Sequence, residues 1–228
     1  DKLSPEAERT QSVNTIVLTD DILVGHNTDI PGFTKAIKDL NFNIKGKKIF
    51  ILGAGGVVPS IIFALNKMNV SEIIISNRTR QKADDLKSQF KIINVIDWGN
   101  IPKFDMIINA TSLGLNNEAL NLNFSEVGDN KLFYDVIYNP SETSFLKEGK
   151  KLGNQSENGK LMFIYQALEA FKLWHEIEPK VNVPSISALL RIVTVPEVWP
   201  RDRLPFEKSP VIKLFPFDPI QRALLIEV

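Results

Sequence analysis

A glycine-rich turn between an apolar segment and an amphipathic one constrains the fold of this 228-residue chain more than any other feature. The apolar segment is Lys48–Leu52, and the turn that follows reads Gly53-Ala54-Gly55-Gly56. From Ser60 to Met68 the apolar residues recur at helical spacing. The order predicts a buried strand, a tight turn and a helix, which is the repeating unit of α/β proteins.

Strand-like and helix-like segments continue to alternate after this unit. Further strands are predicted at 72–76, 92–96, 105–109 and 132–137, and further helices at 79–90, 142–151 and 160–175. Strands that alternate with helices form parallel sheets covered on both faces. We therefore expect a doubly wound, Rossmann-like α/β sheet.

The composition argues against several classes of protein. Hydrophobic residues make up 43% and charged residues 24%, which is too apolar for disorder. Lys and Arg balance Asp and Glu at 27 each, so no net positive charge favours nucleic acid. Without cysteine the chain has no disulfides or thiolate metal site, and no apolar run reaches the roughly 20 residues of a membrane span. We expect a cytoplasmic monomer or homodimer that acts on a small molecule.

The last stretch, Val183–Val228, differs from the rest because it holds seven of the 13 prolines. Proline at that density disfavours long helices and central strands. We expect an irregular extension that limited proteolysis removes without loss of the remaining fold.

The glycine turn also has the context of a dinucleotide-binding loop, since it follows a strand and opens a helix. Gly53 permits the tight turn, Gly55 lets the backbone approach a pyrophosphate, and the helix N-terminus offers unpaired N–H groups to that anion. The third small residue of the usual pattern is replaced by Val58. The alternative is a turn that only joins strand to helix.

The end of the second strand distinguishes between the two dinucleotides. NAD binders carry Asp or Glu there for the ribose hydroxyls, whereas this chain reads Ser76–Arg80 with Lys82 close behind. Arg78 can bind a 2′-phosphate, which a carboxylate would repel. The alternative is an ordinary solvated, basic start of a helix, with Thr79 as its cap.

Polar residues precede or follow other predicted elements. Asp29 lies just before a predicted helix, and taken by itself it is best interpreted as an N-cap. The segments Asn109–Gly114 and Tyr138–Pro140 end strands at the edge where open α/β sheets bind ligands. Both segments are equally compatible with simple turn chemistry.

Seven short segments, taken together, resemble the shikimate dehydrogenase family in order and spacing. They are Gln11–Thr15, Gly25–Asp29 followed by Gly32 and Phe33, Gly53–Gly56, Asn77–Thr79, Asn109–Ser112, Asp135–Pro140, and Asn158 and Gly159 followed by Gln166 and Ala167. The resemblance runs from Asp1 to about Pro179.

The resemblance implies an enzyme that reduces 3-dehydroshikimate to shikimate with NADPH, on the shikimate pathway to chorismate and the aromatic amino acids. It implies that residues 1–30 are the end of a substrate domain and that residues 31–158 form an NADP-binding domain. Residues 159–182 would be a helix that returns to the substrate domain. Beyond Pro179 the family normally ends with one short helix, which the Pro-rich segment 183–228 does not resemble.

The resemblance also implies roles for individual residues, and no metal site. Asp29 would be the catalytic carboxylate of a Lys–Asp pair, and it would bind substrate together with Asn14, Tyr138 and Gln166. The cofactor-binding residues would be Gly53, Ala54, Gly55, Gly56, Asn77, Arg78, Thr79, Val136 and Gly159.

The chain departs from the family where the lysine of that pair is expected. The family places this lysine in an Asn-Val-Thr-x-Pro-x-Lys segment a few dozen residues before the aspartate, and residues 1–28 contain no such segment. We expect the recorded chain to be incomplete at its front. The alternatives are a non-catalytic NADP-binding module and a quinate/shikimate dehydrogenase that uses NAD. Arg78 argues against the use of NAD.

We expect the 228-residue chain by itself to turn over shikimate poorly. Loss of a positioned acid–base group typically costs about 10²–10⁴-fold in rate. The measurement is NADPH formation with saturating shikimate and NADP. A turnover of about 1 s⁻¹ or more, within the usual range of enzymes, would contradict this prediction.

Overall fold

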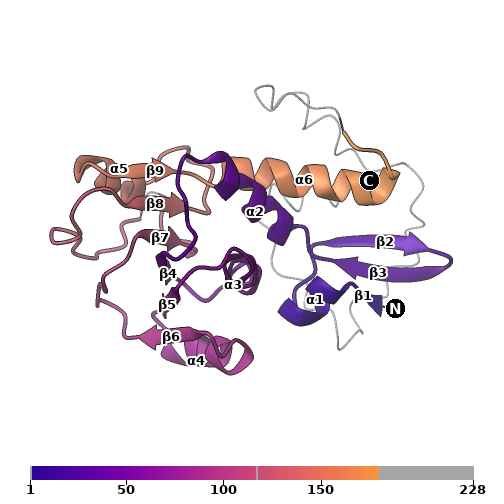
Figure 1. Cartoon of the computed structure of the whole chain (residues 1–228), viewed down its shortest axis with the longest axis horizontal. Helices are drawn as coiled ribbons and strands as arrows, with labels where there is room; N and C mark the ends of the chain where they lie inside the picture. The colour runs from indigo at the N-terminus through magenta and orange to yellow at the C-terminus, as the bar shows by residue number, and fades with distance from the viewer. Residues whose placement is uncertain (1, 117, 180–228) are drawn as a thin grey trace.

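The computed structural model describes residues 2–116 and 118–179. The Pro-rich segment 183–228, expected to be irregular, lies outside the described residues. Figure 1 shows a large sheet with its helices at one end of the molecule and a small sheet at the other, with α6 (Lys160–His175) reaching from one to the other.

The large sheet contains six parallel strands in the order β6-β5-β4-β7-β8-β9, which confirms the predicted α/β class. The strands are β4 (Lys48–Leu52), β5 (Glu72–Ser76), β6 (Ile93–Ile96), β7 (Met106–Asn109), β8 (Leu132–Asp135) and β9 (Gln155–Glu157). Leu52 at the end of β4 lies opposite Ser76 on one side and Asn109 on the other. The register therefore brings the loops after β4, β5 and β7 to the same edge of the sheet.

The two faces of this sheet are covered differently. On one face, apolar residues of α2 (Asp29–Asp39), α3 (Val58–Lys67) and α4 (Arg80–Gln89) pack against the inward residues of the strands. The other face has α5 (Ser144–Lys151) and a cluster of aromatic residues, many of them from loops. At its centre the ring of Phe133 lies 5.1 Å from that of Phe145 and 5.6 Å from that of Phe124.

Two predicted boundaries need correction after β8. The strand predicted to reach residue 137 ends at Asp135, because the Asp135 side chain accepts a hydrogen bond from the Ile137 N–H at 3.0 Å and turns the chain. The helix predicted from residue 142 begins at Ser144, where the Thr143 hydroxyl caps it by accepting from the Leu146 N–H.

The small sheet was not predicted. It has the order β1-β3-β2, with β1 (Lys2–Leu3), β2 (Thr15–Thr19) and β3 (Ile22–His26), and α1 (Pro5–Thr10) joins β1 to the rest. A two-residue turn connects β2 to β3, with φ of 49° at Asp20 and 61° at Asp21. Two successive left-handed residues are the requirement of a tight hairpin, and Asp tolerates that conformation better than most residues.

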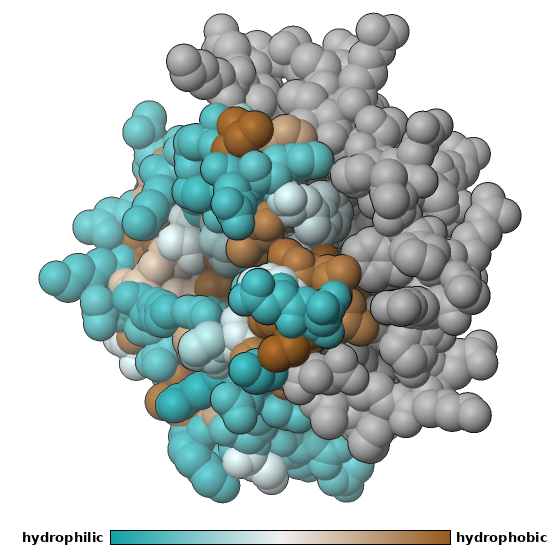
Figure 2. Space-filling view, turned by 90° about the vertical axis from the view of Figure 1, so that its right-hand side faces the viewer, coloured by the Kyte–Doolittle hydropathy of each residue, from teal (hydrophilic) through white to brown (hydrophobic). Residues whose placement is uncertain are grey.

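Helix α6 joins the two ends of the molecule. Its first half packs on α2, and near its C-terminus the Trp174 indole N–H donates to the Ile16 carbonyl of β2 at 2.9 Å. Figure 2 shows that end of the molecule, where hydrophobic surface lies between hydrophilic regions, and Leu18 of β2 is 54% exposed. No helix of residues 2–116 and 118–179 is long and apolar enough to cross a membrane.

The contact between α2 and α6 depends on Gly32. A Cβ at this position would lie 2.9 Å from both the Met162 carbonyl oxygen and the Gln166 backbone nitrogen, closer than real contacts allow. Because both neighbours are backbone atoms of a helix, they cannot move aside cheaply.

We therefore expect Gly32→Val to lower the free energy of unfolding by about 1–3 kcal/mol, the usual cost of overpacking a core. Urea denaturation measures the difference. The control is Lys38→Ala on the exposed side of the same helix. Equal midpoints for the two variants would show that α6 does not depend on close approach at Gly32.

Candidate functional site

The loop after β4 is built around Gly53, which has φ of +110°. Its N–H donates to the Ser76 carbonyl at 2.8 Å, and a Cβ would lie 2.6 Å from the Ala110 carbonyl oxygen. Gly55 is exposed, and the nearest protein atom to its Cβ position is 3.8 Å away. Gly53 is therefore required by the protein's own packing, whereas Gly55 leaves room for another molecule.

The start of α3 offers an anion site next to this loop. Val57 at the N-cap provides no side-chain hydrogen bond, and the first turn has no acidic residue. The positive end of the helix dipole is therefore not neutralised by a nearby carboxylate. Val58, which replaces the small residue of the usual pattern, is fully buried against the core and fits there.

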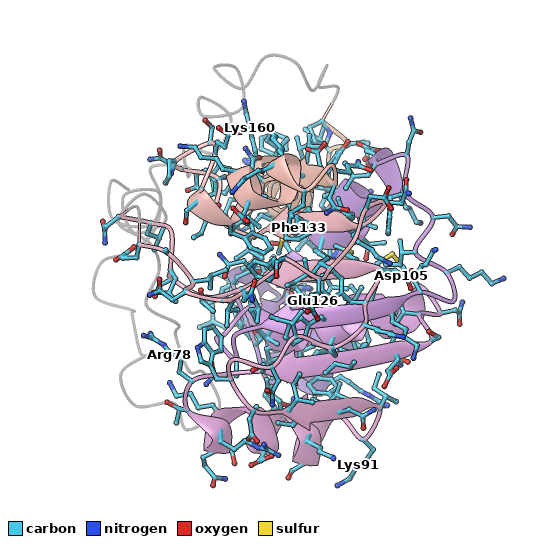
Figure 3. All side chains as sticks on the ribbon, turned by 90° about the vertical axis from the view of Figure 1, so that its left-hand side faces the viewer. Arg78, Lys91, Asp105, Glu126, Phe133 and Lys160 are labelled. Carbon is cyan, nitrogen blue, oxygen red and sulfur yellow. The ribbon has the colours of Figure 1, made fainter. Side chains whose placement is uncertain are left out.

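The segment after β5 contains cations with different surroundings. Arg80 forms ion pairs with Asp84 and Asp97, so it fits the interpretation of a solvated helix start. Arg78 is exposed, and none of the carboxylates in the described part of the chain lies within ion-pair distance of it. Figure 3 shows Arg78 at the edge of the sheet opposite Asp105, which is the edge with the glycine loop. Arg78 can therefore bind an anion there.

The turn before α4 is held by Asn77, whose side-chain amide donates to the Thr79 carbonyl at 2.8 Å. Thr79 occupies the N-cap position but makes no side-chain capping bond, so its predicted role as a cap is wrong. Because its hydroxyl is not used by the helix and the residue is exposed, Thr79 retains a free donor and acceptor near Arg78.

Val136 and Gly159 are in direct contact at the same edge. A Cβ at Gly159 would lie 2.1 Å from the Val136 carbonyl oxygen, so this position requires glycine. The Val136 N–H donates to the Asn109 carbonyl at 3.0 Å, and the Gly159 N–H to the Ile137 carbonyl at 3.1 Å. These bonds hold the start of α6 against the end of β8.

The polar ends of β7 and β8 are hydrogen-bonded to each other. The Asn109 amide donates to both Asp135 oxygens at 3.1 Å, and its oxygen accepts from the Thr111 hydroxyl at 2.7 Å. The Thr143 hydroxyl donates to Asp135 at 2.6 Å. Burial raises the pKa of Asp135 to about 6, against the opposing effect of its donors, chiefly Thr143 and the Ile137 N–H.

A second carboxyl group lies where the small sheet meets α2. Asn14 donates its side-chain amide to Asp29 Oδ1 at 2.9 Å, while its oxygen accepts from the Thr28 N–H at 2.8 Å and from the Thr15 hydroxyl at 3.2 Å. The bond to the Thr28 N–H fixes the orientation of the amide, so Asn14 must point a donor at Asp29. One N–H of Asn14 and the Asp29 Oδ2 atom make no hydrogen bond to the described residues.

Burial raises the pKa of Asp29 from 3.8 to about 6, and the Asn14 hydrogen bond opposes the shift. The residue as a whole is only partly buried, so water or a ligand still reaches it. A carboxyl group with this pKa is mostly ionised at neutral pH and binds a proton when the pH falls below about 6.

The interpretation of Asp29 as an N-cap is wrong. Helix α2 begins at Asp29 itself, and the capping bond comes from Asn27, whose Oδ1 accepts from the Ile30 N–H at 3.2 Å. No role was predicted for Asn27. The signal was an amide residue three positions before Ile30, at the spacing of a helix cap.

Tyr138 and Gln166 approach the same junction from the α6 side. The Tyr138 ring stacks on Phe163 of α6 with centroids 4.6 Å apart, and Gln166, the next turn of that helix, lies against Gly32 of α2. Gly32 lies three residues after Asp29, slightly less than one helical turn further along α2. The packing of α6 on the first turn of α2 thus places Gln166 near the start of α2, and Tyr138 lies one turn before it against Phe163.

A family model and curated relatives of this chain name the same family. The family model described as Shikimate / quinate 5-dehydrogenase matches residues 34–125. The chain is 53% identical over 190 residues to the shikimate dehydrogenase (NADP(+)) of Pelagibacter ubique (strain HTCC1062), covering 83% of this chain and 72% of that protein.

Two solved structures are similar to this chain over most of its length. The shikimate dehydrogenase from Aquifex aeolicus has a TM-score of 0.73 at 33% identity and covers 85% of this chain and 70% of its own. That of Thermus thermophilus, in complex with NADP(H) and shikimate, has a TM-score of 0.73 at 32% identity and covers 84% and 71%.

We expect Asp29→Asn to stabilise the protein at neutral pH. Because the folded pKa of Asp29 is raised, the native carboxyl binds its proton more tightly than the unfolded one, and its contribution to stability falls as pH rises from 3.8 to about 6. Asn carries no charge to desolvate and can still accept from Asn14. The gain should be about 1–2 kcal/mol at neutral pH, less than the full shift implies because Asp29 is partly exposed.

Urea denaturation of both proteins between about pH 4 and 8 measures this difference. The gain in unfolding free energy should shrink toward pH 4, where the side chain at position 29 is neutral in both folded proteins. The contribution of Asp135 cancels because both proteins contain it. Asp129→Asn gives the baseline for loss of an exposed carboxyl group. A difference that stays constant across the whole range would contradict the role of burial.

Proposed function

The chain belongs to the shikimate dehydrogenase family, and on that premise we propose that it serves the NADP-dependent interconversion of 3-dehydroshikimate and shikimate in aromatic amino acid biosynthesis. The observation that carries the proposal is the Asn14–Asp29 pair, in which one amide hydrogen bond holds the carboxyl group and no other described residue bonds its second oxygen. A ketone that accepts hydride needs a proton at its oxygen, and a shikimate hydroxyl must lose one in the reverse direction.

The residues of the sheet edge fit NADP(H). The open side of Gly55 and the uncapped start of α3 suit a pyrophosphate, with Gly53, Ala54 and Gly56 forming the rest of the loop. Arg78, with Asn77 and Thr79, would hold the 2′-phosphate of the adenosine ribose, and Val136 and Gly159 would lie beside the nicotinamide. When bound, NADP(H) supplies or accepts the hydride.

The junction of α2, α6 and the small sheet would hold the substrate. At neutral pH the mostly ionised Asp29 can accept a hydrogen bond from a substrate hydroxyl or pair with an ammonium group. The remaining N–H of Asn14 and the amide of Gln166 would bind further hydroxyls of the ring, and Tyr138 would form part of the wall. Asp29 thus holds or releases the proton while its neighbours orient the substrate.

The proposal extends to organisation and location. Residues 1–30 and 159–182 would belong to the substrate unit and 31–158 to the NADP-binding domain. We further propose that the protein works in the cytoplasm as a monomer or homodimer, with its cofactor and a small cyclic acid as its ligands and neither nucleic acid nor membrane among its partners.

We expect Arg78→Ala to weaken NADPH binding by about 1–3 kcal/mol, because it removes a charge-assisted hydrogen bond to the 2′-phosphate. NADH lacks that phosphate, so its affinity should change little. Isothermal titration calorimetry with both cofactors measures the two effects.

The matched control is Lys91→Ala, which removes one exposed positive charge before β6, at the opposite edge of the sheet (Figure 3). This control separates a local contact from a general loss of charge. If the unaltered chain binds NADH more tightly than NADPH, the assignment of Arg78 to the 2′-phosphate is wrong.

A further inference from the structure

One buried amide, that of Asn27, connects three segments that are distant in the sequence. Its side-chain nitrogen donates to the Ser60 hydroxyl oxygen at 2.8 Å and to the Ser12 carbonyl at 3.1 Å, and its oxygen accepts from the Ile30 N–H at 3.2 Å. Asn27 is 6% exposed. The orientation of this amide is fixed, because a flip would place its oxygen against the Ser12 carbonyl and its NH₂ group against the Ile30 N–H.

Through Ser60, Asn27 contacts the helix whose start we propose to bind the cofactor pyrophosphate. Ser60 is the third residue of α3, one turn after the glycine loop, and it is fully buried. Its hydroxyl therefore moves with the helix start that faces the pyrophosphate site.

The bond to Ile30 reaches the substrate side. Ile30 follows Asp29 in the first turn of α2, and the backbone of that turn sets the direction of the Asp29 carboxyl group. Asn14 holds the same turn from the opposite direction through the Thr28 N–H and Asp29 itself. Two amides thus fix the start of α2, but only Asn27 also contacts α3.

We propose that Asn27 is a positioning residue that fixes the first turn of α2, and with it Asp29, to the first turn of α3. The inference deepens the proposed function and rests on it, because it assigns to Asn27 the alignment of the proton-handling carboxyl group with the cofactor loop. Hydride transfer and proton transfer occur at adjacent atoms of one substrate, so small errors in this alignment lower the rate strongly.

The other contacts between the same units are of a different kind. Helices α2 and α3 also pack through apolar residues of one core cluster, which hold the helices together but make no hydrogen bond to the turn before α2. Lys67 of α3 pairs with Glu6 at 3.6 Å, and the Gln89 amide of α4 donates to the Arg9 carbonyl at 3.2 Å. Both contacts involve exposed groups of α1 and lie away from the start of α2. Removal of the Asn27 amide should therefore leave the units together but loosen the turn that carries Asp29, which Asn14 alone would then hold.

The experiment compares Asn27→Ala and Ser60→Ala with the unaltered chain by carbon-13 NMR of the aspartate carboxyl groups. Asp29→Asn identifies the Asp29 resonance. Ser60→Ala removes only the link to α3 and keeps the other bonds of Asn27, so it serves if Asn27→Ala does not fold. Asn94→Ala is the control, since it removes an exposed side-chain amide that bonds Glu72 across the edge of the sheet.

We expect the titration midpoint of Asp29 to fall by about one pH unit in Asn27→Ala, because the loosened turn admits water to the carboxyl group. Ser60→Ala should lower it in the same direction by less, and Asn94→Ala should not change it. A purely structural role would lower the unfolding temperature while the Asp29 midpoint stays constant. That outcome in both Asn27→Ala and Ser60→Ala would overturn the proposal.

Addition of NADP to the same samples separates this inference from the proposed function. In the unaltered chain NADP should shift the Asp29 resonance. In Ser60→Ala this NADP-induced shift should be at most half as large. The affinity of Ser60→Ala for NADP should change by less than about twofold, because Ser60 lies behind the start of α3 and not in the loop itself. Absence of NADP binding to the unaltered chain would contradict the proposed function, and the midpoints would still decide the role of Asn27. Binding with equal Asp29 shifts in both proteins would overturn the link through Ser60.

Discussion

The close approach of three strand ends at Gly53 is the constraint on which the cofactor side of this structure depends. The backbone of Gly53 bonds the end of β5 and lies against the turn after β7, in a conformation that a side chain would prevent. Because the strands are parallel, their carboxyl ends must meet at one edge, and the loops there can come together only if the first turn is very tight. The position of Arg78 next to the glycine loop follows from this packing.

The substrate side depends on buried polar bonds instead. Asn14 and Asn27 each hold the start of α2 through a backbone N–H, and both have oriented side-chain amides. An unpaired buried polar group costs roughly 1–3 kcal/mol, so such a network strongly favours one arrangement. The same surroundings partly desolvate Asp29, and this burial raises its pKa to about 6 against the opposing effect of the Asn14 hydrogen bond.

The two sides also differ in charge. The start of α3 and Arg78 present positive potential without a neutralising carboxylate in the described residues, whereas Asp29 presents a desolvated negative group across the junction. Anionic phosphates therefore favour the first region, and hydroxyls or cations favour the second. This separation suits a reaction in which one ligand carries the hydride and the protein handles the proton.

Local sequence determined much of this structure. The strands β4 and β5 and the helix α6 match their predicted ranges, because apolar runs and helical periodicity report burial directly. The glycine loop and the absence of an acid after β5 predicted a cofactor-binding edge, since turn geometry and charge are local properties. The small sheet escaped prediction because its strands are short and only partly buried, so their pattern is weak.

Tertiary structure alone decided which polar residues act as turn supports and which remain available. Arg78 and Arg80 look equivalent in the sequence, but among the described residues only Arg80 forms ion pairs with carboxylates. Asp29 resembled a helix cap, yet the capping hydrogen bond comes from Asn27, and the Asp29 carboxyl group accepts from Asn14 instead. Hydrogen-bond partners such as Asn27 and Ser60 are 33 residues apart, so their pairing depends on the complete fold and not on any local pattern.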